Sequence, residues 1–581
     1  MDYKRWIKGT TLLCVMAALT LVGCGSDDAA PTAKTPASAT AVPVATTAPV
    51  PTAAPTGPQG KLDIALVDLG TERWIPRMMG PEEVVFWDML LDPIIGMSRK
   101  DGFTHDLSLG LAESWNMVET GDKIDLTLNL RKGVKYHNNN GTVKASDLKF
   151  AWGQIMREGG IYFAAGDFKK AIGNDITKLE VKDELTLIVH TDKKTAPAGF
   201  ERNTLGGQRF QGLYPEEYFK NLGGEEEFKK APVGSGPFKF IKHTPSQSVE
   251  FEAVADHWLQ TSDFAKVTFH KVPEPATQIA QLLAGQVHIV SLTPRQVKEI
   301  GNAKNVNIVK IDGGGEVFVN FGGMVLKELD GYDATSPWTG PELTGKKPTA
   351  IRKALNLAID REAILTKLLS NEGRITSMPF FYDQPNTPWH GGWTTHKYDP
   401  VAAKAAMAEG GYPDGFTMKA FIYPLAYGPT NGDVMEAVLG MWEKHLGIKA
   451  ERIVTEYRPT VRTRLVDRTT AGYMYTYTQG SVNDPYTYFS GACCFLSSAV
   501  LGHWEIPEVD KLVWAAEKEY DEAKRWALMK QVGDFIYDNY IGASIAQINI
   551  MWGVNSDTVA SWTPTPGSGN LRDVAYIKRL A

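Results

Sequence analysis

From residue 61 onward, the chain alternates between segments with strand-like and segments with helix-like hydrophobic spacing. One apolar stripe at helical spacing ends at Gly285, and a strand is expected directly after it, at 287–292. Further helices are expected where Asp360 and Asp399 stand in front of apolar stripes, because an aspartate there can cap the first amides of a helix. Strands interleaved with helices in this way favour an α/β fold.

The chain has 581 residues, which is more than one hydrophobic core usually fills, so two or more domains are expected. Hydrophobic residues make up 43% and charged residues 22% of the sequence, as in ordinary globular proteins. The formal net charge is −6 and no basic stripe is evident, so nucleic acid is not expected as a partner.

The N-terminus has the pattern of a bacterial lipoprotein leader. Basic residues precede the short apolar run "TTLLCVMAALTLVG", which predicts a signal peptide over residues 1–23. The run ends in "LVGC", where a lipobox would place a lipid on the thiol of Cys24. Ordinary secretory cleavage is the alternative, and Cys24 would then be incidental.

Residues 24–60 are rich in Ala, Pro, Thr and Ser and have almost no large apolar side chains. Such a segment cannot bury enough surface to fold, and its prolines favour extended conformations. We therefore expect a disordered tether between a lipidated Cys24 and a folded part that begins near Lys61.

Several motifs of the folded part occur together and in a characteristic order. They are "LAESWNMVETGDKIDLTLNLRKGVKYHNNNGTVKASDLKFAW", "PVGSGPFKF", "LLAGQVHIV", "IRKALNLAIDREAI", "YDPVAAKAAMAEGGYPDGF" and "TAGYMYTYTQGSVNDP". With this set the chain resembles the extracellular solute-binding proteins of bacterial ABC importers, family 5, the dipeptide/oligopeptide-binding class.

The resemblance implies an α/β, two-lobed clamshell of the type II periplasmic-binding-protein kind, with an extra inserted subdomain. Lobe I would comprise residues 61–93, 231–313 and 541–581, the inserted subdomain residues 94–230, and lobe II residues 314–540. The glycine-rich "DGGGEVFVNFGG" (312–323) would open a strand at a crossing between lobes and act as a hinge.

The resemblance also implies a function. The protein would capture a small organic solute between the lobes and deliver it to ABC permease subunits, from the periplasm or the outer face of the cell membrane. A ligand that touches both lobes binds the closed state better and so shifts the population toward closure. A peptide-like solute is the family default, and an oligosaccharide, an opine or a similar solute is the alternative. A monomer without cofactor or metal is expected.

Two other functional classes remain as alternatives, a secreted hydrolase and a signalling co-receptor on the same fold. The motifs Gly-x-Ser-x-Gly and His-Glu-x-x-His and a Walker loop are absent from the sequence, and so we expect no enzyme.

The segment "SVNDPYTYFSGACCF" (481–495) carries one specific departure from peptide receptors. In those receptors an aspartate three residues before the acidic-Pro pair binds the α-ammonium of the peptide. Here that pair is Asp484-Pro485, and Ser481 stands at the anchoring position. A hydroxyl does not replace the charge of a carboxylate, so this departure argues against free peptides. Asp484 could pair with the ammonium instead, or could set a turn before Pro485.

Aromatic residues supply the other ligand-binding candidates, because flat rings with polar handles suit organic solutes. Three alternate along an expected strand, two lie in a glycine-containing loop, and one follows the first strand; they are Tyr473, Tyr475, Tyr477, Trp389, Trp393 and Trp74. Each could instead pack inside a lobe.

Cys493 and Cys494 are the only cysteines expected in the mature domain besides Cys24. In an oxidising compartment they could form a vicinal disulfide, stay as two buried thiols, or form a metal pair.

Overall fold

The computed structural model describes residues 57–580 apart from a set of short segments. Those segments are 81–82, 101–103, 161, 163–164, 197–212, 302, 382–387, 426–427, 481–488, 490–494 and 567–570. The expected signal peptide, Cys24 and nearly all of the tether lie outside the described residues.

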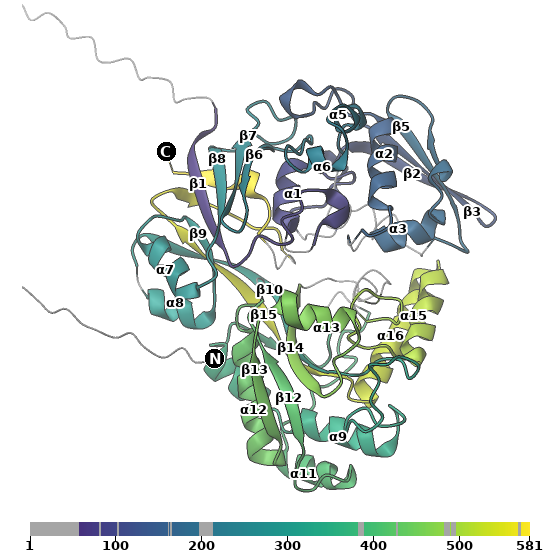
Figure 1. The fold of residues 1–581 in the computed structure, drawn as a ribbon, viewed down its shortest axis with the longest axis vertical. Coiled ribbons are helices and arrows are strands. Elements are labelled where there is room, and N and C mark those ends of the chain that lie inside the picture. Colours follow the sequence, from purple (N-terminus) through teal and green to yellow (C-terminus); the bar gives the residue numbers. More distant parts are fainter. Residues whose placement is uncertain are drawn as a thin grey trace, which may run out of the picture. The chain divides into compact units, whose positions relative to one another are not determined.

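One mixed sheet of eleven strands runs through the described part (Figure 1). Its order is β13-β12-β14-β10-β15-β9-β1-β8-β7-β6, and β11 pairs with β15 off this path. In chain order the strands are β1 (Gln59–Leu66), β6 (Phe238–Thr244), β7 (Ser248–Ala253), β8 (Phe264–Lys271), β9 (Ile289–Leu292), β10 (Val306–Phe321), β11 (Gly373–Ile375), β12 (Thr417–Ile422), β13 (Lys449–Val454), β14 (Tyr473–Gly480) and β15 (Ala543–Asn555).

The two long strands β10 and β15 join the two ends of this sheet. They pair antiparallel with each other, while β10 also pairs with β14 and β15 also pairs with β9. We call the part built on β1 and β6–β9 the β1 half, and the part built on β11–β14 the β14 half. The chain passes into the β14 half through β10 and returns through β15.

The glycine run of β10 lies inside the strand, because β10 begins at Val306, ahead of the expected start. The pairing with β15 shifts register between Ile311 and Gly315, and Gly313 has φ +57. A Cβ at Gly313 would lie 2.8 Å from the Gln547 side chain, and one at Gly314 would lie 2.7 Å from Ile550. The close approach of β15 thus requires glycines there. Their role as a hinge stays a prediction.

In the β1 half, helices cover a sheet whose apolar residues are buried. Leu62 and Ile64 of β1 have no exposed surface, and Phe86 of α1 packs edge-on against Phe269 of β8 with the ring centroids 5.0 Å apart. Gly285 has φ +68 just after α7, as expected for a helix end. The helices are α1 (Val84–Leu90), α7 (Pro275–Leu283) and α8 (Pro294–Ile300).

A separate four-stranded sheet, in the order β2-β3-β5-β4, is formed within residues 94–230. Alternate residues of β3 are buried, from Ile124 to Leu130, and the strand's other face is largely exposed. We call this unit the insert. Its elements are β2 (Ala112–Thr120), β3 (Lys123–Leu130), α2 (Ala145–Ile155), α3 (Ala165–Ile172), β4 (Leu179–Val181), β5 (Thr186–Asp192), α5 (Glu216–Asn221) and α6 (Glu225–Phe228).

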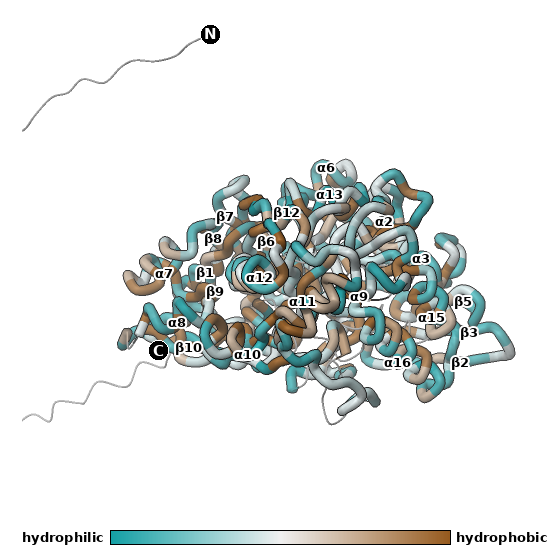
Figure 2. Tube along the Cα trace, turned by 90° about the horizontal axis from the view of Figure 1, so that it is seen from below, coloured by the Kyte–Doolittle hydropathy of each residue, from teal (hydrophilic) through white to brown (hydrophobic). Residues whose placement is uncertain are grey.

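In the β14 half, two predicted helix starts are confirmed. The Asp360 carboxylate accepts from the amide of Ala363, and the Asp399 carboxylate accepts from the amide of Ala402. Figure 2 shows hydrophobic and hydrophilic residues alternating along α16 of this half, as they do along α7 of the β1 half. The helices of this half are α9 (Lys346–Leu357), α10 (Arg361–Ala363), α11 (Pro400–Glu409), α12 (Asn431–Leu446), α13 (Thr463–Val466), α15 (Pro507–Lys518) and α16 (Glu522–Asp538).

The C-terminal residues return to the β1 half after β15. The short strands β16 (Val559–Ser561) and β17 (Lys578–Arg579) pair there, and Arg572 forms an ion pair with Asp88 of α1. In the described part of the chain, no helix is both long and apolar enough to cross a bilayer. The domain boundaries expected from the sequence stay predictions.

Candidate functional site

The carboxyl ends of strands from both halves point to the region where the paired strands β10 and β15 pass from one half to the other, around Ile311 to Gly315 of β10. We call this region the crossing. β14 ends at Gly480, which pairs with Gly315 of β10, and β12 and β13 run parallel to β14. From the other side, β1 runs parallel to β9 and ends toward the same crossing. In open α/β sheets, ligands bind outside the carboxyl ends of the strands, so we place the candidate site at this crossing.

The loop after β1 is fixed by Glu83, whose carboxylate accepts from the amides of Thr71, Glu72 and Gly80 at 2.5–2.9 Å. Trp74 has φ +33, an uncommon backbone state for a bulky residue. Its ring is only 6% exposed and lies 5.1 Å from the Phe240 ring. The Trp74 Nε1–H is buried and has no hydrogen-bond partner among the described residues.

The three tyrosines of β14 alternate along the strand and so lie along one of its faces. Tyr473 stacks on Phe421 with the rings 4.6 Å apart. The Tyr475 hydroxyl bonds the Nδ1 of His503 at 3.0 Å, and the Tyr477 ring lies 4.9 Å from the same imidazole. Burial lowers the pKa of His503 to about 3, so this imidazole is neutral at physiological pH.

Trp389 and Trp393 join their loop to α16. The Trp389 ring lies 4.8 Å from the Trp526 ring and is 2% exposed, and the Trp393 Nε1–H donates to Asp534 at 3.0 Å. In this state both tryptophans pack within the β14 half. Contact of these residues, of Trp74 or of the tyrosines with a ligand stays a prediction.

Four other candidates, Ser481, Asp484, Cys493 and Cys494, lie outside the described residues. The described residues around them are Gly480, beside the glycines of β10, and the buried Phe489 and Phe495, whose rings lie 5.6 Å and 4.4 Å from the Phe380 ring. In the described part of the chain, no group of three or more His, Cys, Asp or Glu side chains is arranged to hold a metal ion.

Sequence reasoning missed Glu316, a fully buried carboxylate at the crossing. It accepts hydrogen bonds from the Phe380 amide at 2.8 Å and from the hydroxyls of Thr376 and Ser544 at 3.2 Å each. Burial raises its pKa to about 7. The available signal was an acidic residue directly after three glycines in an otherwise apolar strand.

Buried polar atoms without partners lie on the same face of the sheet. Gln479, which is opposite Glu316 across the strands, and Asn320, which is opposite Tyr475, have side-chain atoms with no hydrogen-bond partner among the described residues. An unpaired buried polar group is costly, so such atoms mark a place where water or a polar ligand can be accommodated.

The profile described as "Bacterial extracellular solute-binding proteins, family 5 Middle" matches residues 106–494, well over half of the chain. The chain belongs to this family. It is therefore a family 5 solute-binding protein, and the likeness expected from its motifs is confirmed.

Two curated relatives show how varied the named ligands are among similar proteins. The dipeptide-binding protein of Escherichia coli is 22% identical to this solute-binding protein over 77% of this chain and 82% of its own length. Heme-binding protein A of Haemophilus influenzae is 26% identical over 62% of this chain, and the match spans 63% of that protein.

Solved structures show the same two-lobed α/β fold. The periplasmic binding protein DppA from Helicobacter pylori, in complex with the peptide STSA, has a TM-score of 0.71 at 18% identity, with 90% of this chain and 99% of that chain covered. The expected type II clamshell is thereby confirmed.

In this solute-binding protein, a group of contacts joins the insert to the β14 half; we call it the latch. Lys170 of α3 pairs with the nearly buried Glu517 of α15 at 3.0 Å. The Tyr520 hydroxyl donates to the carbonyl oxygen of Ala196 at 3.0 Å, and the Lys518 ammonium donates to the carbonyl oxygen of Lys194. These contacts can exist only when the insert and α15 are close, so they favour the state in which they form.

Removing the latch is expected to weaken ligand binding without touching the ligand. The double variant Tyr520→Phe, Lys170→Met loses one hydrogen bond and one ion pair, together roughly 1–2 kcal/mol. If only the latched state binds tightly, the apparent Kd rises by about five- to thirtyfold, mainly through faster dissociation. Stopped-flow fluorescence measures this rate. The control Tyr398→Phe loses a hydroxyl contact to His445 within the β14 half and should leave the rate unchanged. Equal dissociation rates for wild type and the double variant would disprove the role.

Proposed function

We propose that this protein is a lipid-anchored receptor of an ABC importer that binds a peptide-like solute and delivers it to the permease without chemical turnover. The lipid would be attached at Cys24, and the folded part would work in the periplasm or on the outer face of the cell membrane. The observation that carries the proposal is the convergence of strand carboxyl ends from both halves at the β10–β15 crossing.

Family membership supports the receptor role, and relatives named for dipeptides and a solved relative with a bound peptide support a peptide-like ligand. The relative named for heme supports the second candidate, a non-peptide solute. Within the site we retain Trp74, Tyr477, Ser481 and Asp484 as the first residues to test, because they belong to the carboxyl ends of β1 and β14 or to the segments that follow them.

Native mass spectrometry of protein purified without refolding is expected to show a retained solute. Thermal unfolding with di- to pentapeptides, heme, opines and oligosaccharides then sorts the classes. A ligand at 100 times its Kd stabilises the folded protein by about 2.7 kcal/mol. Stabilisation by peptides supports the first candidate, and stabilisation by non-peptides alone supports the second. Chemical conversion of a bound solute would overturn both.

Position 481 offers a sharper test of peptide recognition. With serine there, a peptide and its N-acetylated form should bind with similar Kd, because no carboxylate at this position selects the ammonium. Ser481→Asp should strengthen binding of the free peptide by roughly tenfold or more through a charge-assisted hydrogen bond and leave the acetylated peptide unchanged. Ser481→Asn introduces a side chain of the same size as aspartate but without the charge, and this variant should not prefer the free peptide over the acetylated peptide. A wild-type protein that strongly prefers the free peptide would show that another carboxylate, with Asp484 the first to test, pairs with the ammonium, and a preference that survives Asp484→Asn would contradict the assignment of position 481.

A further inference from the structure

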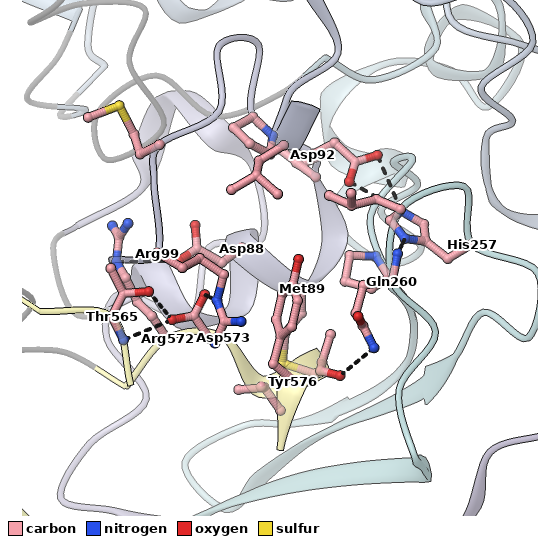
Figure 3. Close-up of a pocket in the computed structure, with 18 of the residues that line it drawn as sticks. Asp88, Met89, Asp92, Arg99, His257, Gln260, Thr565, Arg572, Asp573 and Tyr576 are labelled. Carbon is pink, nitrogen blue, oxygen red and sulfur yellow. Dashed lines mark hydrogen bonds and ion pairs between the residues drawn. The ribbon is translucent and has the colours of Figure 1, made fainter. Parts of the chain in front are cut away.

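A cavity lies under the C-terminal residues in the β1 half, and we call it the tail pocket (Figure 3). Its volume is about 140 Å³, several times the roughly 30 Å³ that one water molecule occupies in the liquid. It lies between α1 and the chain just after it, the segment that follows β7, and Thr565 with residues 572–576 of the C-terminal tail.

The tail pocket is separate from the site at the β10–β15 crossing. None of the described residues that line it comes from 314–540. Val85, Asp88 and Met89 of α1 face it, whereas Phe86 and Trp87 of the same helix pack against Trp74 in the loop after β1. The helix α1 therefore stands between the tail pocket and Trp74 in the loop after β1.

Most charged groups around one end of the pocket are engaged with one another. The Asp573 carboxylate accepts from the amide and hydroxyl of Thr565 and lies 3.4 Å from the Nε of Arg99. The Arg99 guanidinium also donates to the carbonyl oxygen of Thr563 and lies 3.7 Å above the centre of the Tyr576 ring. These contacts fix the position of the C-terminal tail over the pocket.

Asp88 is the exception. Among the described residues it has one partner, the Arg572 guanidinium, with Nε 3.4 Å from Oδ2, which is an ion pair without a well-formed hydrogen bond. Asp88 lines the pocket, and Figure 3 shows its side chain beside those of Arg99, Arg572 and Asp573. Partial burial, which leaves the side chain 22% exposed, raises its pKa to about 7 because it weakens the solvation of the charged form.

At the other end, Asp92 accepts from the Trp258 Nε1–H at 2.8 Å and contacts His257 at 3.2 Å. The His257 Nδ1 accepts from the Gln260 amide at 3.1 Å. The pocket thus holds three carboxylates against two guanidinium groups, a net charge of −1 when Asp88 is ionised. Its remaining walls are largely apolar and include Met89, Met97, Leu109, Leu259 and Val574.

We propose that the tail pocket binds a small primary alkylammonium ion, whose ammonium group pairs with the Asp88 carboxylate and whose short apolar chain packs between Met89 and Leu259. An ammonium carries three donors and no acceptor, which suits a carboxylate that has unused lone pairs. The excess of negative charge selects a cation over an anion, and the apolar walls select a short carbon chain over a bare metal ion.

The test titrates the full folded protein with n-butylammonium chloride at pH 8, followed by calorimetry or by ligand-observed NMR. One saturable site is expected, with n-butanol at least about tenfold weaker because it lacks the charge. Asp88→Asn, which keeps the size of the side chain, should weaken butylammonium binding by about tenfold or more. The control Asp125→Asn changes a carboxylate on the exposed face of the insert and should not alter it. Equal affinity in the Asp88→Asn variant, equal affinity for n-butanol, or no saturable site would overturn the proposal.

The pH dependence of the wild type keeps the proposal testable if Asp88→Asn folds poorly. Binding should weaken by roughly tenfold or more between pH 8 and pH 5, as Asp88 takes up a proton. The other titratable groups that face the pocket are Asp92, Asp573, His257 and Tyr576, with the cations Arg99 and Arg572. Binding that does not change over this range would also overturn the proposal. Binding of the solute at the crossing is independent of Asp88, so the two proposals can fail separately.

Discussion

Replacing Arg352 with methionine is expected to destabilise the β14 half by about 3–5 kcal/mol. The guanidinium is fully buried and donates to the carbonyl oxygens of Asn539, Trp338 and Leu343 at 2.7–2.8 Å. Among the described residues no carboxylate forms an ion pair with it, and burial alone lowers its pKa to about 9. Methionine has similar length but leaves three buried carbonyl groups without a donor, which is the more costly outcome.

Calorimetry should show the unfolding transition of this half moved down by roughly 10 °C. Arg352→Lys keeps the charge but not the forked set of donors, and its unfolding temperature should lie between those of the wild type and of Arg352→Met. Arg295→Met is the matched control, because Arg295 is exposed and, among the described residues, its ion pair is with Glu299 of the same helix. A shift for Arg352→Met no larger than that of the control would show that the buried guanidinium is not a structural element.

Glu316→Gln is expected to make the protein more stable than wild type at pH 8 but not at pH 5. The pKa of Glu316 in the folded state is about 7, above the ordinary value of 4.5. Between these values the folded state holds a proton that the unfolded chain has released. The contribution of this group is therefore fully present below about pH 4.5 and is lost as pH rises through 7.

Glutamine copies the protonated carboxyl, because its amide oxygen can accept from Phe380 and its NH₂ can donate to the hydroxyls of Thr376 and Ser544. The stability gap between variant and wild type should grow by about 2–3 kcal/mol from pH 5 to pH 8. Urea unfolding at both pH values measures it. Asp88, whose pKa is also raised, is unchanged in both proteins and cancels. Glu299→Gln, an exposed change, should show no such gap, and a constant gap for Glu316→Gln would show that Glu316 is ionised throughout.

Local sequence signals predicted the parts of this fold that depend on neighbouring residues. The caps at Asp360 and Asp399 and the turn at Gly285 involve partners within a few positions. The two-lobed architecture came from motif order, since periodicity alone indicates only an α/β fold. The sequence predicts that β10 begins at its glycine run, because glycines usually mark the end of a strand. In the structure β10 begins earlier, at Val306, and the glycines lie inside the strand where β15 approaches it closely.

The long-range polar contacts could not be predicted in this way. Arg352 and Asn539 lie 187 positions apart, and Glu316 and Ser544 lie 228 apart. The motif "IRKALNLAIDREAI" marked the family, but nothing local indicates that its two arginines, Arg352 and Arg361, are buried against backbone carbonyls. The tail pocket likewise depends on Asp88 and Arg572, which come from opposite ends of the folded chain.

The path of the chain through β10 and β15 has a mechanical consequence. The chain between β10 and β15 is joined covalently to the β1 half through these two strands, which form an antiparallel ribbon. The interstrand hydrogen bonds of the ribbon are perpendicular to its long axis. Such a ribbon resists extension along the strands more than twisting and bending, and the hinge predicted at the glycine bulge would be the place where it bends. Capture and release would therefore change the angle of the β14 half while its distance from the β1 half stays nearly constant. A permease that contacts both halves would then distinguish the solute-bound from the solute-free receptor by the relative orientation of the β1 and β14 halves.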